Sequence, residues 1–355
     1  MKLLFVYPSD CEATSIISRY DRYAQVLYQR DQIVCLSMPS RRFLDAKTGS
    51  RTEIDQFDVI ILHIAVLATS AKEIQHWKAR DKLIIGDLSS PVILNENQES
   101  YTLYPSCSSL DDGSEGSNRS VDRNQLLWTI KLTDGLITNS EVMQREWKGI
   151  RPTRYIPDYA VAENVQIKPR EKQRVSQIGI VINSGGFDRL VDCAIYPEIE
   201  RSLMKHPDCR LVIFGEHPHQ AHQLQVPPAQ KLFIASSDRS TWQNLLSEID
   251  ICLLPYSGCV DERIGRLDIL ELMLYRIPWV ASSIRWLTPY QQFGWVIENT
   301  AVNWEKTIND LMEHGSYYQS ETLEGYLFAL SQCLEENAYK LIEYISMIIR
   351  AKGAG

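Results

Sequence analysis

Two short stretches carry residue types that could do chemistry on a phosphate-bearing substrate. In INSGGFDRL, Gly185 and Gly186 follow an apolar run, so their backbone N–H groups can approach a diphosphate closely, and Arg189 can neutralise its charge. In IIGDLSSP, Asp87 stands at the end of a predicted strand, where a proton acceptor or a partner for a substrate hydroxyl would be needed. A tight turn with a surface arginine, and a turn-forming aspartate, are the open alternatives.

A third stretch, RLDILELMLYRIPWVAS, places the carboxylate of Glu271 among neighbours that are nearly all apolar. Asp268, Glu271 and Tyr275 are spaced at i, i+3 and i+7, so they could form the solvated stripe of an amphipathic helix. The other interpretation is that Glu271 is there to bind a ligand. Spacing alone leaves both interpretations open.

Several activities that depend on a short motif are poorly supported. The dinucleotide fingerprint Gly-x-Gly-x-x-Gly follows none of the predicted strands, and neither a Walker phosphate loop nor a Gly-x-Ser-x-Gly elbow occurs. The three histidines of GEHPHQAH lack a carboxylate at a known ligand spacing, and Pro218 interrupts any helix there. We therefore expect no metal and no cofactor. With Gly215 and Glu216, this stretch more simply forms the edge of a nucleotide pocket.

The elements that position these residues follow a repeated pattern. Short apolar runs alternate with longer amphipathic stretches, which is typical of strand-helix-strand units around a parallel sheet. The pattern occurs twice, so the sequence predicts an α/β fold with two doubly wound, Rossmann-like domains facing a cleft. Strands are expected at KLLFVYP, QIVCLSM, FDVIILHI, KLIIGDL and GLITNS in the first half, and at IGIVINSGG, CRLVIFGE, KLFIAS, ICLLPYS and PWVAS in the second.

The domain boundaries follow from composition. We expect residues 1–158 to form the first domain, a polar and Pro-containing linker at 159–177, and the second domain at 178–322. Residues 323–355 are strongly helical, and Leu341 begins an apolar stripe at helix spacing. We expect this C-terminal helix to dock back on the first domain rather than to anchor in a membrane.

One segment, Leu94–Gln125, does not fit the alternation. It is rich in Ser, Asn, Asp and Gly and is too long for an ordinary connection between elements. We expect a mobile loop or lid on the first domain, and a disordered insertion is the alternative.

Composition narrows the partners and the location. The 355 residues include 37 Lys and Arg against 45 Asp and Glu, which gives a net charge of -8. Without a basic stripe, binding to nucleic acid is not expected. No apolar run approaches the ~20 residues of a membrane span, and the start lacks a secretory signal. We expect a cytoplasmic protein, with peripheral contact to a membrane left open.

The stretch around Glu271 resembles the donor-binding helix and following strand of GT-B-fold glycosyltransferases, whose pattern is Leu-Glu-x-Met-x-x-Gly-x-Pro-Val-Val-Ala-Ser. PEIERSLMKHPDCRLVIFGE and SEIDICLLPY resemble neighbouring parts of the same domain, in the same order. The resemblance covers most of Ile178 to Ser282 and is closest to the large, usually retaining group that builds bacterial surface glycans. The matching residues are Leu270, Glu271, Met273, Pro278, Val280, Ala281 and Ser282.

This resemblance implies that Glu271 binds both ribose hydroxyls of a sugar nucleotide through charge-assisted hydrogen bonds. The sequence also departs from the family pattern. Many members carry a second Glu eight residues earlier, where Arg263 stands here, and Arg276 and Ile277 replace the usual Gly and its successor before the Pro. Either Arg263 or Arg266 holds phosphate in a differently built donor loop, or the activity has been lost.

The first domain departs from the family as well, because YPSDCEATSIISRYDRY lacks the glycine-rich loop expected after the first strand. Ser9, Asp10 and Arg19 could line the acceptor side instead. A helix start with Asp10 or Ser15 as its cap is the open alternative. His63, at the end of VIILHI, is a further candidate for the cleft, or else a core histidine.

The function that the resemblance implies is a hexosyltransferase or related glycosyltransferase of polysaccharide biosynthesis. It would move a sugar, with retention, from a nucleotide-diphosphate donor to a glycan or lipid-linked acceptor. Asp87, Arg189 and Arg263 are then the expected catalytic residues, and cationic side chains would stabilise the charge that develops on the diphosphate. The rival hypothesis is a degenerate, non-catalytic binding or scaffold subunit, which Arg263 and the missing glycines favour. A nicotinamide-dependent epimerase or dehydrogenase is a third.

Overall fold

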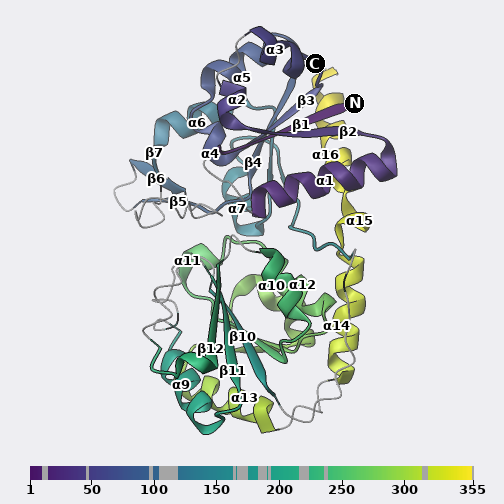
Figure 1. The fold of residues 1–355 in the computed structure, drawn as a ribbon. Coiled ribbons are helices and arrows are strands. Elements are labelled where there is room, and N and C mark those ends of the chain that lie inside the picture. Colours follow the sequence, from purple (N-terminus) through teal and green to yellow (C-terminus); the bar gives the residue numbers. More distant parts are fainter. Residues whose placement is uncertain are drawn as a thin grey trace. The chain divides into compact units, whose positions relative to one another are not determined.

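The chain folds into two compact units, shown in a computed structural model (Figure 1). Unit 1 contains Met1–Asp158, Arg263–Gly265 and Leu334–Gly355, and unit 2 contains Tyr159–Glu262 and Arg266–Cys333. The structure describes residues 1–9, 15–44, 48–95, 99–103, 119–162, 165, 175–182, 190, 193–215, 224–235, 239–313 and 319–353.

Unit 1 is built on a parallel sheet of six strands in the order β2-β1-β3-β4-β8-β9. Its central strands are buried from end to end, as expected for a parallel sheet that is covered on both faces. The chain leaves β1 for β2 on one side and later pairs β3 on the other side, which creates a topological switch point. The strands are β1 (Lys2–Tyr7), β2 (Val34–Pro39), β3 (Val59–His63), β4 (Leu83–Leu88), β8 (Gly135–Thr138) and β9 (Thr153–Tyr155).

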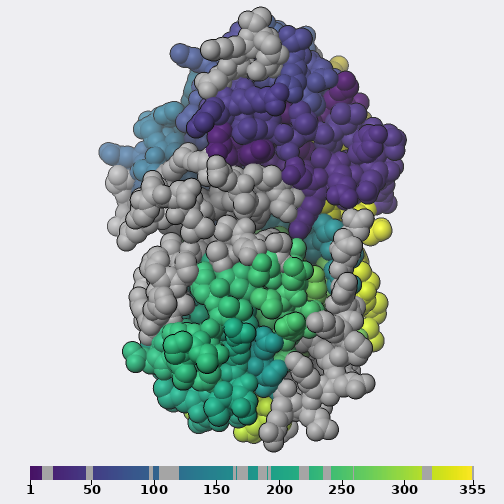
Figure 2. Space-filling model, viewed as in Figure 1, coloured from purple at the N-terminus to yellow at the C-terminus, as the bar shows by residue number. Residues whose placement is uncertain are grey.

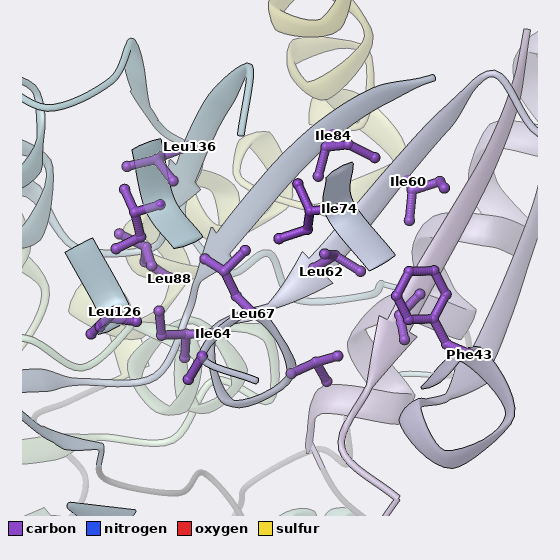
Figure 3. Close-up of a cluster of buried hydrophobic side chains, with 14 of the residues drawn as sticks. Phe43, Ile60, Leu62, Ile64, Leu67, Ile74, Ile84, Leu88, Leu126 and Leu136 are labelled. Carbon is purple, nitrogen blue, oxygen red and sulfur yellow. The ribbon is translucent and has the colours of Figure 1, made fainter. Parts of the chain in front are cut away.

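Helices cover both faces of this sheet. On one face, the side chains of six helices form a single apolar cluster with the strands, part of which Figure 3 shows around Leu62, Leu67 and Ile74. On the other face Tyr20 stacks on Phe5, with ring centroids 4.8 Å apart. The helices of the cluster are α2 (Ser40–Leu44), α3 (Thr48–Asp55), α4 (Ile64–Leu67), α5 (Ala71–Lys78), α6 (Arg123–Leu132) and α7 (Glu141–Trp147); α1 (Ser15–Asp31), α15 (Leu334–Asn337) and α16 (Tyr339–Gly353) complete unit 1.

The segment expected to be a mobile or disordered insertion contains regular structure. Strands β5 (Val92–Leu94), β6 (Ser100–Leu103) and β7 (Arg119–Asp122) form a three-stranded antiparallel sheet, and Asp122 then caps α6. Leu103 is buried in the apolar cluster of unit 1 and Tyr101 packs on Trp147. The sequence did not predict these strands, because each is only three or four residues long and the segment around them is polar. Residues 104–118 lie outside the described residues.

The C-terminal helix α16 packs on unit 1 through apolar and polar contacts. Leu341, Ile345 and Ile348 of the predicted stripe are buried. The hydroxyl of Tyr344 donates to the carbonyl of Pro152 at 2.6 Å and accepts from the backbone N–H of Leu136 at 3.0 Å. These two bonds tie the helix to the strands that it covers.

We predict that Tyr344→Phe lowers the free energy of unfolding by about 1–3 kcal/mol, because the buried N–H of Leu136 and the carbonyl of Pro152 lose a partner. Chemical unfolding in urea would measure the change. Tyr339→Phe is the matched control, since Tyr339 is 43% exposed on the same helix and should change little. If the two substitutions lowered the free energy of unfolding equally, the two hydrogen bonds of Tyr344 would not be what stabilises the packing of α16.

The carboxylate of Asp134, which is 6% exposed, forms a second polar contact between the rest of unit 1 and α16. It accepts from the N–H of Ile84 at 2.8 Å and pairs with Lys78 at 2.9 Å and Lys352 at 3.0 Å. Burial alone would raise the pKa of Asp134, but these hydrogen bonds and the charge of Lys78 outweigh it and lower the pKa below its usual value.

We therefore predict that Asp134→Asn costs about 1–3 kcal/mol of stability near neutral pH. Because the folded-state pKa is depressed, the stabilisation is present above the unfolded pKa of about 3.9 and disappears as the pH falls through the lower, folded value. Urea unfolding of both proteins at a series of pH values tests this. A difference between wild type and variant that does not shrink in acid would contradict it.

Unit 2 repeats the same architecture. Its parallel sheet has the order β12-β11-β10-β13-β14-β15, with a switch point between β10 and β13. The prediction of two doubly wound α/β sheets is therefore confirmed. The strands are β10 (Gln177–Ile182), β11 (Arg210–Gly215), β12 (Lys231–Ala235), β13 (Ile251–Leu254), β14 (Trp279–Ser282) and β15 (Trp295–Ile297).

Helices cover the sheet of unit 2 on both faces. Trp304 is fully buried in the apolar cluster of one face, and on the other face Phe214 stacks on Trp242 at 4.8 Å. Figure 2 shows the surface of this unit in green and teal. The helices are α9 (Tyr196–Lys205), η2 (Pro228–Gln230), α10 (Arg239–Leu246), α11 (Gly258–Asp261), α12 (Leu267–Leu274), η3 (Arg285–Phe293), α13 (Ala301–Glu313) and α14 (Gln319–Ser331).

The chain passes from unit 2 to its last segment between Cys333 and Leu334, later than the boundary expected at residue 323. The reason is the packing of α14, whose Phe328 contacts the rings of Tyr290 and Phe293. Residues 319–331 therefore belong with unit 2. Most of the predicted linker, residues 163–164 and 166–174, lies outside the described residues.

Candidate functional site

The carboxyl edge of the sheet in unit 1 carries a buried polar network. Asp87 lies near the end of β4 with no exposed surface, and Arg19 reaches it from α1. The Arg19 Nη2 atom is 3.9 Å from Asp87 Oδ1, and Nη1 donates to the carboxylate of Asp158. The hydroxyl of Tyr20 donates to Asp87 Oδ2 at 2.8 Å. Two of the predicted residues, Arg19 and Asp87, thus lie together.

Two members of this network were missed in the sequence. Asn139 follows β8 and donates from Nδ2 to Asp158 Oδ2 at 2.6 Å and to the carbonyl of Ser89 at 3.0 Å. Asp158 was assigned to the end of the first domain without a role. The usable signal was position, because Asn139 directly follows a buried strand at the edge where Asp87 lies.

The charges of the network and its burial keep Arg19 and Tyr20 protonated. Burial alone would lower the pKa of Arg19, but the negative charges of Asp87 and Asp158 raise it overall, so the guanidinium stays charged. Burial, and then the charge of Asp87, raise the pKa of Tyr20 well above its usual value. Tyr20 therefore remains a hydrogen-bond donor at neutral pH.

Ser9 and His63 have structural contacts at the same edge. Ser9 Oγ lies 3.0 Å from Ser40 Oγ and accepts from the N–H of Arg41, which joins the loop after β1 to α2. The Nδ1 atom of His63 accepts from the N–H of Ala65 and caps α4. The interpretation of His63 as a core histidine matches its 2% exposure. Asp10 lies outside the described residues.

In unit 2, Glu271 lies on α12 and is 4% exposed, so it is not on a solvated stripe. Gln243 of α10 donates to its Oε1 atom at 3.2 Å. Both helices begin after the carboxyl ends of strands β12 and β13. A buried carboxylate is costly unless it is hydrogen-bonded, so this position favours a binding role or a helix-helix contact over a surface role. The ribose contact stays a prediction.

The two arginines of the predicted donor loop are each engaged. Arg266 donates to the hydroxyl of Tyr290 and, at 3.0 Å, to Gln332 Oε1, and its guanidinium lies over the Tyr290 ring. Arg263, which belongs to unit 1, pairs with Glu146. Arg266 thus holds α12 against η3 and the end of α14. A phosphate contact by either arginine stays a prediction.

Gly215 closes β11 where the backbone of β10 comes close. A Cβ atom at this position would lie 2.7 Å from the carbonyl oxygen of Ile182, its partner in the register. Only a glycine fits there without moving a strand. Gly185, Gly186, Arg189 and Glu216, which were predicted to bind the donor, lie outside the described residues.

The end of β14 is fixed to the loop after β13. Ser282 Oγ accepts from the N–H of Tyr256 at 2.9 Å, and Asp261 accepts from the N–H of Ser257 at 2.5 Å. The side chain of Asn299 donates to the carbonyl of Tyr256 at 2.9 Å. These bonds join the loop after β13 to the end of β14 and to the residues that follow β15.

Within the described ranges, no group of three or more His, Cys, Asp and Glu side chains could hold a metal ion. The histidines of GEHPHQAH are outside these ranges. A search of the described helices also found none that is both long and apolar enough to span a bilayer.

No model of a protein family matches the chain, and a search of curated proteins found no match. Solved structures are similar in fold. Anabaena HepE in complex with UDP-glucose has a TM-score of 0.63 at 14% identity, over 98% of this chain and 100% of that one. A glycosyltransferase from Rickettsia africae ESF-5 has a TM-score of 0.64 at 11% identity, over 98% of each. TarM has a TM-score of 0.56 at 14% identity over 82% of this chain, which spans only 54% of TarM.

These similarities show that the chain has the two-domain fold that the family resemblance implied. The identities of 11–14% are too low to carry a substrate or a mechanism from one protein to another. The fold of these solved structures agrees with the fold predicted from the sequence, and for HepE and the Rickettsia glycosyltransferase the similarity covers 98% of the chain.

We predict that Gly215→Ala destabilises unit 2 by about 1–3 kcal/mol, because the added methyl group overlaps a backbone carbonyl that cannot rotate away. Thermal denaturation would detect the change as a lower Tm. Gly149→Ala is the matched control, since a Cβ there meets nothing within 4 Å. If the two variants melt alike, the close approach of β10 and β11 does not explain the glycine.

Proposed function

We propose that this protein is a glycosyltransferase that moves a sugar from a nucleotide-diphosphate donor, bound by unit 2, to a glycan or lipid-linked acceptor, bound by unit 1. The observation that carries the proposal is Glu271, a buried carboxylate on α12, the second helix after β13, in a chain whose fold resembles HepE with UDP-glucose over 98% of its length. A carboxylate in this position can accept both ribose hydroxyls.

The proposed reaction is retaining and transfers a hexose or a related sugar. The bond between the anomeric carbon and the phosphate oxygen breaks, the acceptor oxygen bonds to that carbon, and its proton passes to the leaving diphosphate. Arg189, Gly185 and Gly186 are proposed to bind the diphosphate and stabilise its charge. Glu216 is proposed to line the edge of the nucleotide pocket.

Gln243 is proposed to orient Glu271, because it donates to one oxygen of the carboxylate. Arg266 is proposed to contribute its positive charge from the place where Tyr290 and Gln332 hold it. Arg263 would serve the diphosphate only after exchanging its contact with Glu146. Asp87 and Arg19 are proposed to belong to the acceptor side.

We predict that Glu271→Gln weakens binding of the preferred nucleotide by about 10–100-fold, the usual worth of hydrogen bonds to a charged group. A thermal-shift titration with UDP, GDP, ADP and CMP and their sugars would identify the nucleotide, since a ligand at a hundred times its Kd stabilises by about 2.7 kcal/mol. Calorimetry would then compare the variant with wild type. Glu313→Gln, an exposed glutamate at the end of α13, is the control.

The outcomes separate the two candidate functions. A shift with one nucleotide that Glu271→Gln weakens, together with slow release of free sugar from the donor, supports the enzyme. No shift with any nucleotide would favour the non-catalytic scaffold. A shift that Glu271→Gln leaves unchanged would keep nucleotide binding and reject the role of this carboxylate.

A further inference from the structure

The polar network in unit 1 is continuous from the end of β4 to the end of β8. Asp87 is near Arg19, Arg19 pairs with Asp158, and Asp158 accepts from Asn139. Gly265 lies against the last two, because a Cβ atom there would overlap the carboxylate of Asp158 and the amide of Asn139. The network therefore occupies the carboxyl edge of the sheet, where ligands of such folds bind.

The net charge of this network is negative. It contains two carboxylates, Asp87 and Asp158, and one guanidinium, Arg19, so one negative charge is left over. Both carboxylates act on Arg19, and the other side chains that act on it electrostatically are the phenols of Tyr20 and Tyr23. The single cation is thus already committed to two anions, and a phosphate or carboxylate placed beside it would meet an excess of negative charge.

The network also has acceptor atoms that need donors. Asp87 Oδ1 and Asn139 Oδ1 are buried and accept no hydrogen bond from any residue that the structure describes. Ser89, whose backbone carbonyl accepts from Asn139, has an Oγ atom that is likewise without a partner in the described part of the chain. Asp87 is 0% exposed and Asn139 is 6% exposed, so an unmet hydrogen bond at either is costly. These oxygens suit a ligand that presents several O–H groups.

We propose that this network binds the hydroxyl groups of an uncharged sugar on the acceptor and discriminates against acceptors that carry phosphate or carboxylate there. The inference rests on the proposed function and narrows it, since it favours a glycan end over a lipid-linked phosphate as the group that meets unit 1. In this role Asp87 and Asn139 touch the acceptor, while Asp158 and Tyr20 are positioning residues that hold Arg19 and Asp87. A hydroxyl group can satisfy an orphaned carboxylate oxygen, which an anion cannot.

Saturation-transfer NMR on the full chain tests the ligand class. The probes are glucose, galactose and mannose and the 6-phosphate of each sugar. We expect at least one neutral sugar to bind about tenfold or more tightly than its phosphate, because an added negative charge meets the surplus charge of the network. Raising the salt from about 30 mM to about 300 mM should narrow this gap in the wild-type protein, since salt screens charges.

Substitutions test the residues. Asp158→Asn makes the network neutral and should reduce the preference for the neutral sugar by about tenfold, while Asp87→Asn should weaken the neutral sugar itself. Asp31→Asn removes the same charge from the exposed end of α1 and should change neither. If either variant fails to fold, the salt titration of the wild-type protein still tests the preference for neutral sugars.

Several results would overturn the inference. One is that the sugar phosphates bind as tightly as the neutral sugars. Another is that no probe binds at all, which would mean that the network only holds α1 to the sheet. Displacement of the neutral sugar by saturating UDP-glucose would instead assign these hydroxyl contacts to the transferred sugar. A nucleotide shift without sugar binding rejects this inference alone, whereas the absence of any nucleotide shift rejects the proposed function.

Discussion

The burial of parallel strands on both faces is the constraint from which the rest of this structure follows. Strands β3 and β4 have no exposed residue, and β13 and β14 in unit 2 are equally buried. Polar side chains within such strands would face apolar helices, so they are tolerated only where a strand ends and partners are at hand. The buried charged groups described above accordingly lie at the ends of strands, as Asp87 does in β4, or enter from helices, as Arg19 and Glu271 do.

The two edges solve the problem of buried charge in different ways. In unit 1, Arg19 enters from a helix and is held between two carboxylates, so each charge has an opposite charge nearby. In unit 2, Glu271 enters from α12 and is held by the neutral amide of Gln243.

The pattern of apolar residues was sufficient to predict the two sheets, but it could not predict which side chains meet at their edges. Apolar runs such as VIILH and ICLL predicted the central strands, because periodicity and burial act locally. The short strands β5, β6 and β7 were missed since three or four residues give no period to detect. Asp158 pairs with Arg19 across 139 positions of sequence and accepts from Asn139 across 19, and no local pattern in the sequence indicates either contact.

The packing of α16 on unit 1 has a consequence for the order in which the chain acquires its structure during synthesis. The ribosome completes unit 2 before it makes Tyr344, whose hydroxyl pairs with Leu136 and Pro152. Until then the part of the first sheet near β8 lacks the helix that covers it, although its strands were translated long before. Domains made earlier usually fold earlier. Here the contacts between α16 and the first sheet can form only after the last helix has been made, so unit 1 is completed after unit 2 has been translated.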